Sequence, residues 1–194
     1  MSNKIQDNNV WFKLNDAQVE LVHEFSQGYI DFLNLAKTER ESVEYIVSAA
    51  LRKGFMNFDD VGKLAPGQKL IYQLKNKACA LIIVGENPLE AGVNIVASHI
   101  DTPRIDLKPR PLYEADEQAL FKTHYYGGIK KYQWLAIPLA LHGVVVKKNG
   151  EKINIKIGEN PDDVVFTISD LLPHLAKDQM EKKISEAIKG EDLN

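Results

Sequence analysis

Residues 94–108 read NIVASHIDTPRIDLK, and the fold assignment depends on this stretch. It opens with NIVASHI, an almost continuously apolar run, as in a β-strand that helices bury on both faces. The run ends at His99, and Asp101 follows two positions later, so both side chains would share one face of the strand while Ile100 points into the core. Pro103 then ends strand pairing. The stretch therefore predicts a buried strand with two polar groups at its carboxyl end, where open α/β sheets bind ligands.

Two helices and two further strands are expected before this stretch. In residues 15–36 the apolar side chains recur mostly at three- and four-residue steps, as on a helix with one buried face. The next segment, TERESVEYIVSAALRKGF, opens with Thr38 and Glu41 in the spacing of a capping box and stops at Gly54. The runs KLIYQLK and ACALIIVG follow as strands, with a hairpin turn at residues 76 and 77. Two helices followed by a layered sheet predict an α/β fold.

The second half of the chain has a different pattern of apolar and polar residues. The runs FKTHYYGGIKKYQW, LAIPLALHGVVVKK, INIKIG and VVFTIS predict strands with alternating or mixed faces, and Asn149 and Gly150 predict a turn. The segment SDLLPHLAKDQM and the charged C-terminus read as helical or loose. We place a domain boundary at the K-P-R-P connection, which gives an α/β domain of residues 1–107 and a β-rich domain of residues 108–194.

Composition excludes several classes of partner. The 194 residues are 44% hydrophobic and carry a formal net charge of −3, with dispersed lysines, so we expect no nucleic-acid partner and no attraction to anionic lipid. No apolar run approaches the roughly 18 residues that span a bilayer, and the N-terminus lacks the apolar core of a signal peptide. The single cysteine, Cys79, lies in an apolar run and fits a reducing compartment, so we expect a cytoplasmic protein.

His99 and Asp101 are the main candidates for chemistry. A neutral imidazole is a good zinc ligand, and a nearby carboxylate can hold its second ring N–H and fix the tautomer. The alternative is an ordinary strand-terminal histidine followed by a turn-forming aspartate. A catalytic zinc usually takes about three protein ligands. Neither an H-E-x-x-H helix nor a Glu-Glu pair follows His99, so the sequence predicts at most part of a metal site.

The other histidines and the cysteine favour structural roles by position. His23 lies in the first predicted helix, His124 has aromatic neighbours, and His142 ends an apolar run. His174 stands among leucines in DLLPHLA, next to a proline that fixes the backbone. Cys79 is expected to be buried, which raises a thiol's pKa and argues against a nucleophile. Nucleophile-elbow, phosphate-loop and dinucleotide signatures are missing from the sequence.

Three ordered motifs together are more specific than H-x-D alone. They are NIVASHIDTPRIDLKPRPLY, LFKTHYYGGIKKYQWLAIPLALHGVVV and VVFTISDLLPHLAKDQM. With them the chain resembles the M18 metallo-aminopeptidases, the group of aspartyl aminopeptidase and aminopeptidase I, and most closely their bacterial members. The resemblance implies that the two helices and first strands belong to a mixed-sheet zinc-peptidase catalytic domain, and that the β-rich half is an incomplete inserted dimerisation domain.

The resemblance also implies roles for individual residues. His99 matches the first zinc ligand of the family, and Asp101 matches the catalytic-site aspartate that orients the site from beside it. His174 is similar to a histidine that reaches into the substrate pocket of a neighbouring subunit, which reverses the structural reading of that residue. The tract of residues 125–128, YYGG, resembles a Y-G-G segment near the start of the dimerisation domain.

The implied function is zinc-dependent removal of N-terminal residues from peptides by a metal-activated water, in a homo-oligomer. The family site holds two zinc ions, and this chain contains one of its ligands; the general base and the remaining ligands belong to segments that the sequence lacks. We therefore expect the N-terminal portion of such an enzyme, inactive by itself. The alternatives are a non-catalytic oligomerisation or interaction module and the remnant of a decayed gene. The preferred N-terminal residue stays open.

Overall fold

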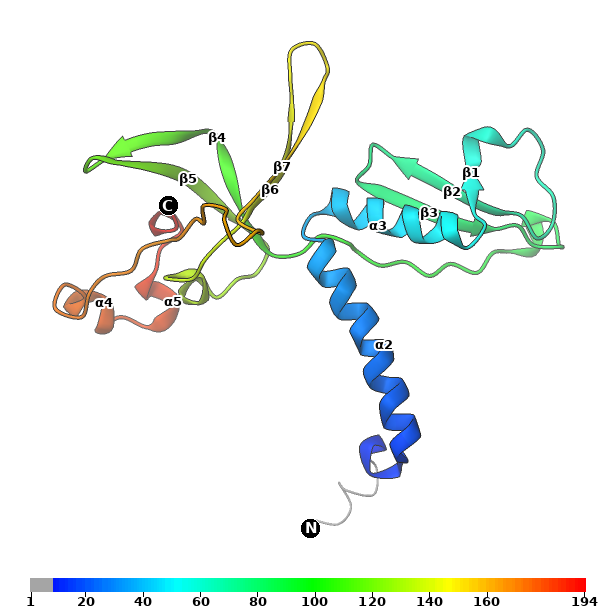
Figure 1. Ribbon diagram of the computed structural model, residues 1–194, viewed down its shortest axis with the longest axis horizontal. Helices are drawn as coiled ribbons and strands as arrows, with labels where there is room; N and C mark the ends of the chain where they lie inside the picture. The colour runs from blue at the N-terminus through cyan, green and yellow to red at the C-terminus, as the bar shows by residue number, and fades with distance from the viewer. Residues whose placement is uncertain (1–8) are drawn as a thin grey trace. The chain divides into compact units, whose positions relative to one another are not determined.

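The structure is a computed structural model that describes residues 9–194 (Figure 1). The chain divides into two compact units, Met1–Ile100 and Asp101–Asn194. The first unit combines helices with a small sheet, and the second is built from two-stranded ladders and short helices. The mixed α/β class is therefore as predicted.

Both predicted helices form in the first unit, after a short 3₁₀ turn, η1 (Val10–Lys13). Helix α2 spans Asp16–Leu35, and the side chains of Asn15 and Gln18 each accept a hydrogen bond from the other's backbone N–H in a capping box. Helix α3 spans Glu39–Arg52, and the hydroxyl of its N-cap, Thr38, accepts from the backbone N–H of Glu41 at 3.3 Å. The Glu41 carboxylate accepts from the N–H of Lys37, one residue before the cap, so only half of the predicted capping box forms.

The sheet of the first unit has the order β1-β2-β3, with β1 (Met56–Asn57) parallel and β3 (Ala78–Ile83) antiparallel to β2 (Lys69–Leu74). A 3₁₀ turn, η2 (Phe58–Asp60), follows β1. The β2–β3 turn covers residues 75–77, and Lys75 and Asn76 adopt positive φ as hairpin turns require. It begins one residue earlier than predicted.

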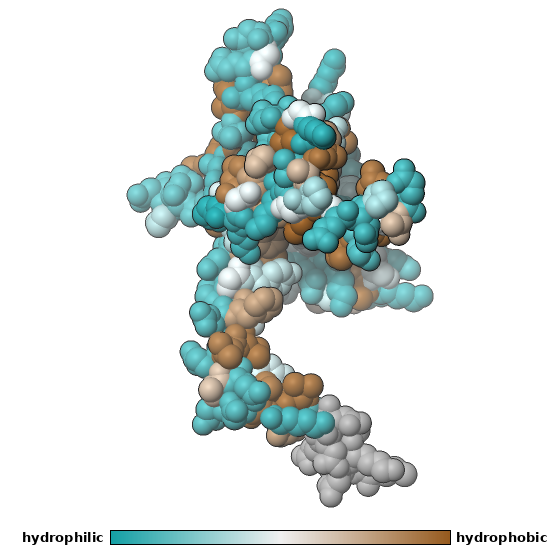
Figure 2. Space-filling model, turned by 90° about the vertical axis from the view of Figure 1, so that its right-hand side faces the viewer, coloured by the Kyte–Doolittle hydropathy of each residue, from teal (hydrophilic) through white to brown (hydrophobic). Residues whose placement is uncertain are grey.

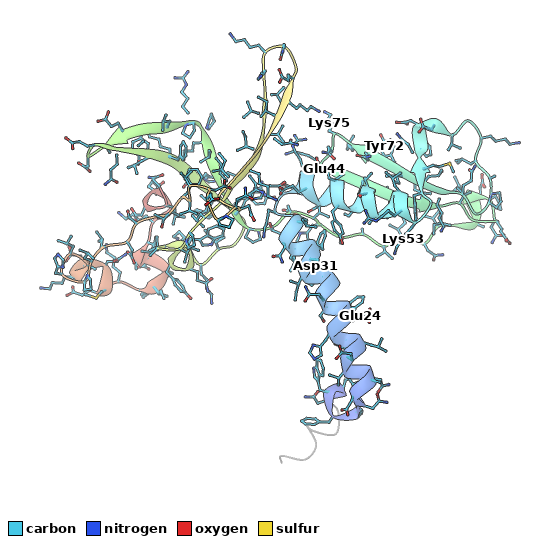
Figure 3. The ribbon with its side chains drawn as sticks, in the orientation of Figure 1. Glu24, Asp31, Glu44, Lys53, Tyr72 and Lys75 are labelled. Atoms are coloured by element: carbon cyan, nitrogen blue, oxygen red, sulfur yellow. The ribbon has the colours of Figure 1, made fainter. Side chains whose placement is uncertain are left out.

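Helix α3 is fixed to this hairpin by polar contacts at both of its ends. Asn76 donates from Nδ2 to the Glu44 carboxylate at 2.9 Å, and the Arg40 guanidinium donates to the Lys75 carbonyl at 3.2 Å. Figure 3 shows Glu44 and Lys75 at this junction. At the other end, the Lys69 ammonium donates to the carbonyl of Lys53. These contacts hold the helix over strands whose apolar side chains need cover.

The strand predicted at residues 94–100 does not form. After the 3₁₀ turn η3 (Leu89–Ala91), residues 92–103 belong to no strand. Ile95 is 79% exposed and Val96 is fully exposed. The prediction was wrong because a strand is defined by hydrogen bonds to a neighbour, and an apolar sequence supplies the side chains but not the neighbour.

The second unit is β-rich, as the sequence predicts. Strand β4 (Arg104–Ala115) pairs antiparallel with β5 (Gln118–Tyr126), with a register shift between Leu107 and Leu112. Strand β6 (Leu141–Val146) pairs antiparallel with β7 (Lys152–Ile157). The run VVFTIS makes only an isolated bridge, between Phe166 and Leu139, where a full strand was predicted.

Short helices connect and follow these ladders. They are η4 (Lys131–Trp134), α4 (Lys177–Met180), α5 (Ile184–Ala187) and η5 (Gly190–Asp192). The small core of the unit consists of Ile168, Ile188 and Leu193. The Thr123 hydroxyl of β5 donates to the Leu193 carbonyl, and its N–H donates to the Asn194 side chain at 3.0 Å. Across residues 9–194, the structure has no helix long and apolar enough to cross a membrane.

Candidate functional site

His99 and Asp101 lie on either side of the division between the two units. His99 is exposed, in the strand-free segment that ends the first unit, and Asp101 is the half-buried first residue of the second. Because no strand forms at residues 99–101, strand alternation does not place the two side chains on one face. The same-face argument from the sequence therefore has no strand to rest on in this structure, and the zinc role of His99 and the orienting role of Asp101 stay predictions.

The carboxylate of Asp101 is held by the end of the β4–β5 ladder. The Tyr126 hydroxyl donates to Asp101 Oδ2 at 2.7 Å. The guanidinium of Arg104 lies over the Tyr126 ring, 4.1 Å from its centroid, and Arg104 Nε donates to Asp106 Oδ1 at 2.8 Å. Arg104 and Tyr126 are directly opposite each other in the ladder. The side chains of four residues thus contact one another in sequence, from Asp106 through Arg104 and Tyr126 to Asp101. The series ends on the carboxylate that is predicted to orient the His99 imidazole.

Sequence reasoning singled out the tract that contains Tyr126 but missed that Tyr126 and Arg104 meet beside Asp101. Their contact depends on the pairing register, which brings residues 22 positions apart opposite each other. The available signal was the position of both residues next to motifs, since Arg104 follows D-T-P and Tyr126 opens Y-G-G. Neither motif alone shows that the two segments are neighbours.

His174 lies in an exposed turn before α4. Leu171, Leu172 and Leu175 are themselves exposed, so the apolar surroundings expected for His174 are not found. The physical reason is that leucines adjacent in sequence bury a neighbour only when another element covers them. The role of His174 in a neighbouring subunit's substrate pocket stays a prediction.

The remaining candidates have structural contacts. His142, near the start of β6, lies 2.9 Å from the Glu159 carboxylate through Nε2, with a side chain only 7% exposed, in agreement with the structural role predicted for it. The ring of His124 stacks on that of Tyr125, at 5.6 Å between centroids. Burial raises the pKa of the Cys79 thiol, as predicted, although Cys79 is only half-buried in β3.

A complete zinc site is not formed by residues 9–194. Among the residues that the structure describes, no group of three or more His, Cys, Asp or Glu side chains is placed to hold a metal ion. A catalytic zinc needs about three protein ligands. The donor chemistry of His99 suits one zinc ligand, and residues 9–194 do not bring together the three ligands that a complete site needs.

Comparison with known proteins places these features in a family. A family model described as aminopeptidase I zinc metalloprotease (M18) matches residues 32–193. A probable M18 family aminopeptidase 1 of Borreliella afzelii is 47% identical over 186 residues, covering 95% of this chain and 41% of that protein. The corresponding protein of Thermotoga maritima is 47% identical over 191 residues, covering 98% of this chain and 41% of its own length.

Solved structures agree with the sequence comparison. The crystal structure of an M18 aminopeptidase from Thermotoga maritima superposes with a TM-score of 0.87 at 46% identity, over 96% of this chain and 40% of that one. Aminopeptidase I from Clostridium acetobutylicum gives a TM-score of 0.83 at 38% identity, over 95% and 41% of the two chains. The chain spans about two fifths of the length of these relatives, and it corresponds to their N-terminal portion. From residue 32 almost to its last residue, the chain belongs to the M18 family of aminopeptidases.

Proposed function

We propose that this chain supplies the N-terminal portion of a zinc-dependent aminopeptidase, which removes N-terminal residues from peptides. The observation that carries the proposal is the match of residues 32–193 to a family described as zinc metalloproteases. The similarity to the Thermotoga maritima aminopeptidase, at 46% identity and a TM-score of 0.87, supports it. The lone, half-buried Cys79 is in keeping with a cytoplasmic location, which is part of the proposal.

In this proposal His99 supplies one imidazole ligand to zinc, and Asp101 orients that imidazole through its second ring nitrogen. His174 serves the substrate pocket of a neighbouring subunit. The catalytic part ends at residue 107, and residues 108–194 begin the dimerisation domain. No catalytic step is assigned to the chain alone, because the described residues do not complete a metal site.

The test is hydrolysis of aminoacyl-anilides by the purified chain with added Zn²⁺. We expect little or no activity from the 194-residue polypeptide. Adding a separately produced remainder of an M18 relative should restore hydrolysis, and His99→Ala should abolish the restored activity. Strong hydrolysis by the chain alone would contradict the proposed inactivity, and full restored activity in the His99→Ala variant would contradict its role as a ligand.

A second candidate function is self-association, and the apolar surface of α2 favours it. The exposed large apolar side chains of this helix are Leu21, Phe25, Tyr29, Ile30, Leu33 and Leu35. Figure 2 shows hydrophobic residues along α2. Extended apolar surface of this kind is typical of protein interfaces. A solved aminopeptidase structure from Saccharomyces cerevisiae, 24% identical with a TM-score of 0.62, is a dodecamer.

Sedimentation velocity of the chain tests this candidate. We expect a dimer or larger species that Phe25→Glu shifts to monomer, because Phe25 is 83% exposed and its ring would lie in the contact. Glu24, labelled with Asp31 on α2 in Figure 3, offers the matched control Glu24→Gln, which should leave the assembly intact. A monomeric wild-type chain would exclude the candidate.

A further inference from the structure

We propose that Tyr126 is a positioning residue for the carboxylate of Asp101, and that this is the purpose of the Y-G-G tract that opens with it. The inference rests on the proposed function, in which Asp101 orients the imidazole of His99. It gives a role to a tract that the implied mechanism leaves without one.

The first argument is the hydrogen bond between the two side chains. Tyr126 donates from its hydroxyl to Asp101 Oδ2 at 2.7 Å, a length typical of a charge-assisted bond. Tyr126 is 40% exposed, so water competes for both groups. Such a bond fixes a carboxylate only if the phenol ring is itself held in place.

The second argument is that the Tyr126 ring is held. The Arg104 guanidinium lies on the ring face, 4.1 Å from the centroid, well within the range of a cation–π contact. Arg104 in turn donates from Nε to Asp106 at 2.8 Å, so its own position is fixed. Because Arg104 and Tyr126 are cross-strand neighbours, the ladder sets the geometry of the contact.

The third argument is the backbone on either side of the hydrogen bond. Gly127 has a φ of +79°, a conformation that disfavours any residue with a side chain. A Cβ at this position would stand 3.6 Å from Pro103, so the turn after Tyr126 passes against the segment that carries Asp101. Pro103 stiffens that segment, because its ring restricts its own φ and the conformation of Thr102. Both partners of the hydrogen bond therefore sit on restrained backbone.

These contacts distinguish Tyr126 from the preceding residue. Tyr125 stacks on His124, and the Lys131 ammonium lies 5.7 Å from the centroid of its ring. Tyr125→Phe is thus a matched control for Tyr126→Phe, with the same atom removed from the adjacent position.

The first readout is the ring ¹⁵N spectrum of His99 in the full chain at neutral pH without metal, assigned with His99→Gln. We expect Asp101→Ala to shift the His99 tautomer balance toward that of a free imidazole. Tyr126→Phe should shift it in the same direction by a smaller amount, while Tyr125→Phe leaves it as in the wild type. A shift with Asp101→Ala but none with Tyr126→Phe would overturn the positioning role.

The second readout keeps the inference separate from the proposed function. If neither Asp101→Ala nor Tyr126→Phe moves the His99 signals, the orienting role of Asp101 fails. A double-mutant cycle on urea unfolding then tests separately whether Tyr126 and Asp101 are energetically coupled. Tyr126→Phe should raise the unfolding equilibrium constant roughly fivefold to tenfold in the wild type, as for a typical hydrogen bond that water partly replaces, and much less in Asp101→Ala. Equal effects in both backgrounds would show that the two residues are not coupled and would overturn the inference.

Discussion

Strand β2 and residues 93–100 are apolar segments of similar length in the same unit, but one forms a buried strand and the other forms no strand. In β2, Leu70 and Ile71 are 0% and 2% exposed, because β1 and β3 flank the strand and α3 packs on the sheet. In the second segment, Ile95 is 79% exposed and no strand forms. The difference shows that an apolar run predicts side chains that are stabilised by burial. Whether they are buried depends on which other elements of the chain pack against them.

The largest expected contrast is in amide hydrogen exchange. Amides of β2 in its ladder should exchange only on global unfolding, which corresponds to about 5–15 kcal/mol in a typical domain. Amides of residues 93–98 should exchange at close to unprotected rates, because they belong to no ladder. Exchange measured by mass spectrometry after short pulses checks this, and equal protection of the two segments would show that residues 93–98 are paired in solution.

A matched pair of substitutions gives the next largest effect. Ile71→Ala removes a buried side chain and should destabilise the first unit by about 2–5 kcal/mol. Ile95→Ala makes the same chemical change at an exposed position and should stay within about 0.5 kcal/mol. Urea unfolding followed by circular dichroism measures both. If Ile95→Ala lowered the free energy of unfolding about as much as Ile71→Ala, another surface would have to bury residue 95, for example in an assembly.

The smallest effect concerns the loop of residues 158–163, which is ordered by one side chain instead of a ladder. Backbone N–H groups of Asn160 and Gly158 donate to the Asp163 carboxylate and hold its pKa below the usual value of 3.8. Because the folded pKa is the lower one, ionised Asp163 stabilises the loop above about pH 3.8, and this contribution is lost as the pH falls through the folded pKa.

Carboxyl ¹³C titration of Asp163 measures this prediction directly. We expect a midpoint below 3.8, the usual value for an aspartate carboxyl. Asp163→Asn should remove the pH dependence of the loop's chemical shifts in this range. A midpoint at or above 3.8 would contradict the hydrogen-bonded geometry.

Local signals explain which elements the sequence predicts correctly. The side chains of Asn15 and Thr38 cap helices within three residues of themselves, so the starts of α2 and α3 follow from neighbouring residues alone. The β6–β7 hairpin likewise depends on a turn containing Gly150, whose φ is +85°. The predicted strand at residues 94–100 needed a distant partner, and the prediction failed there.

The candidate site divides in the same way. The sequence by itself determined the two helices, the β-rich second half and, through three motifs, the family to which the chain belongs. Only the tertiary structure decided that Tyr126 and Arg104 meet beside Asp101, and that residues 93–99 remain exposed. The physical reason is that capping and turn chemistry act over a few residues, whereas ladder register and burial depend on which distant segments come together.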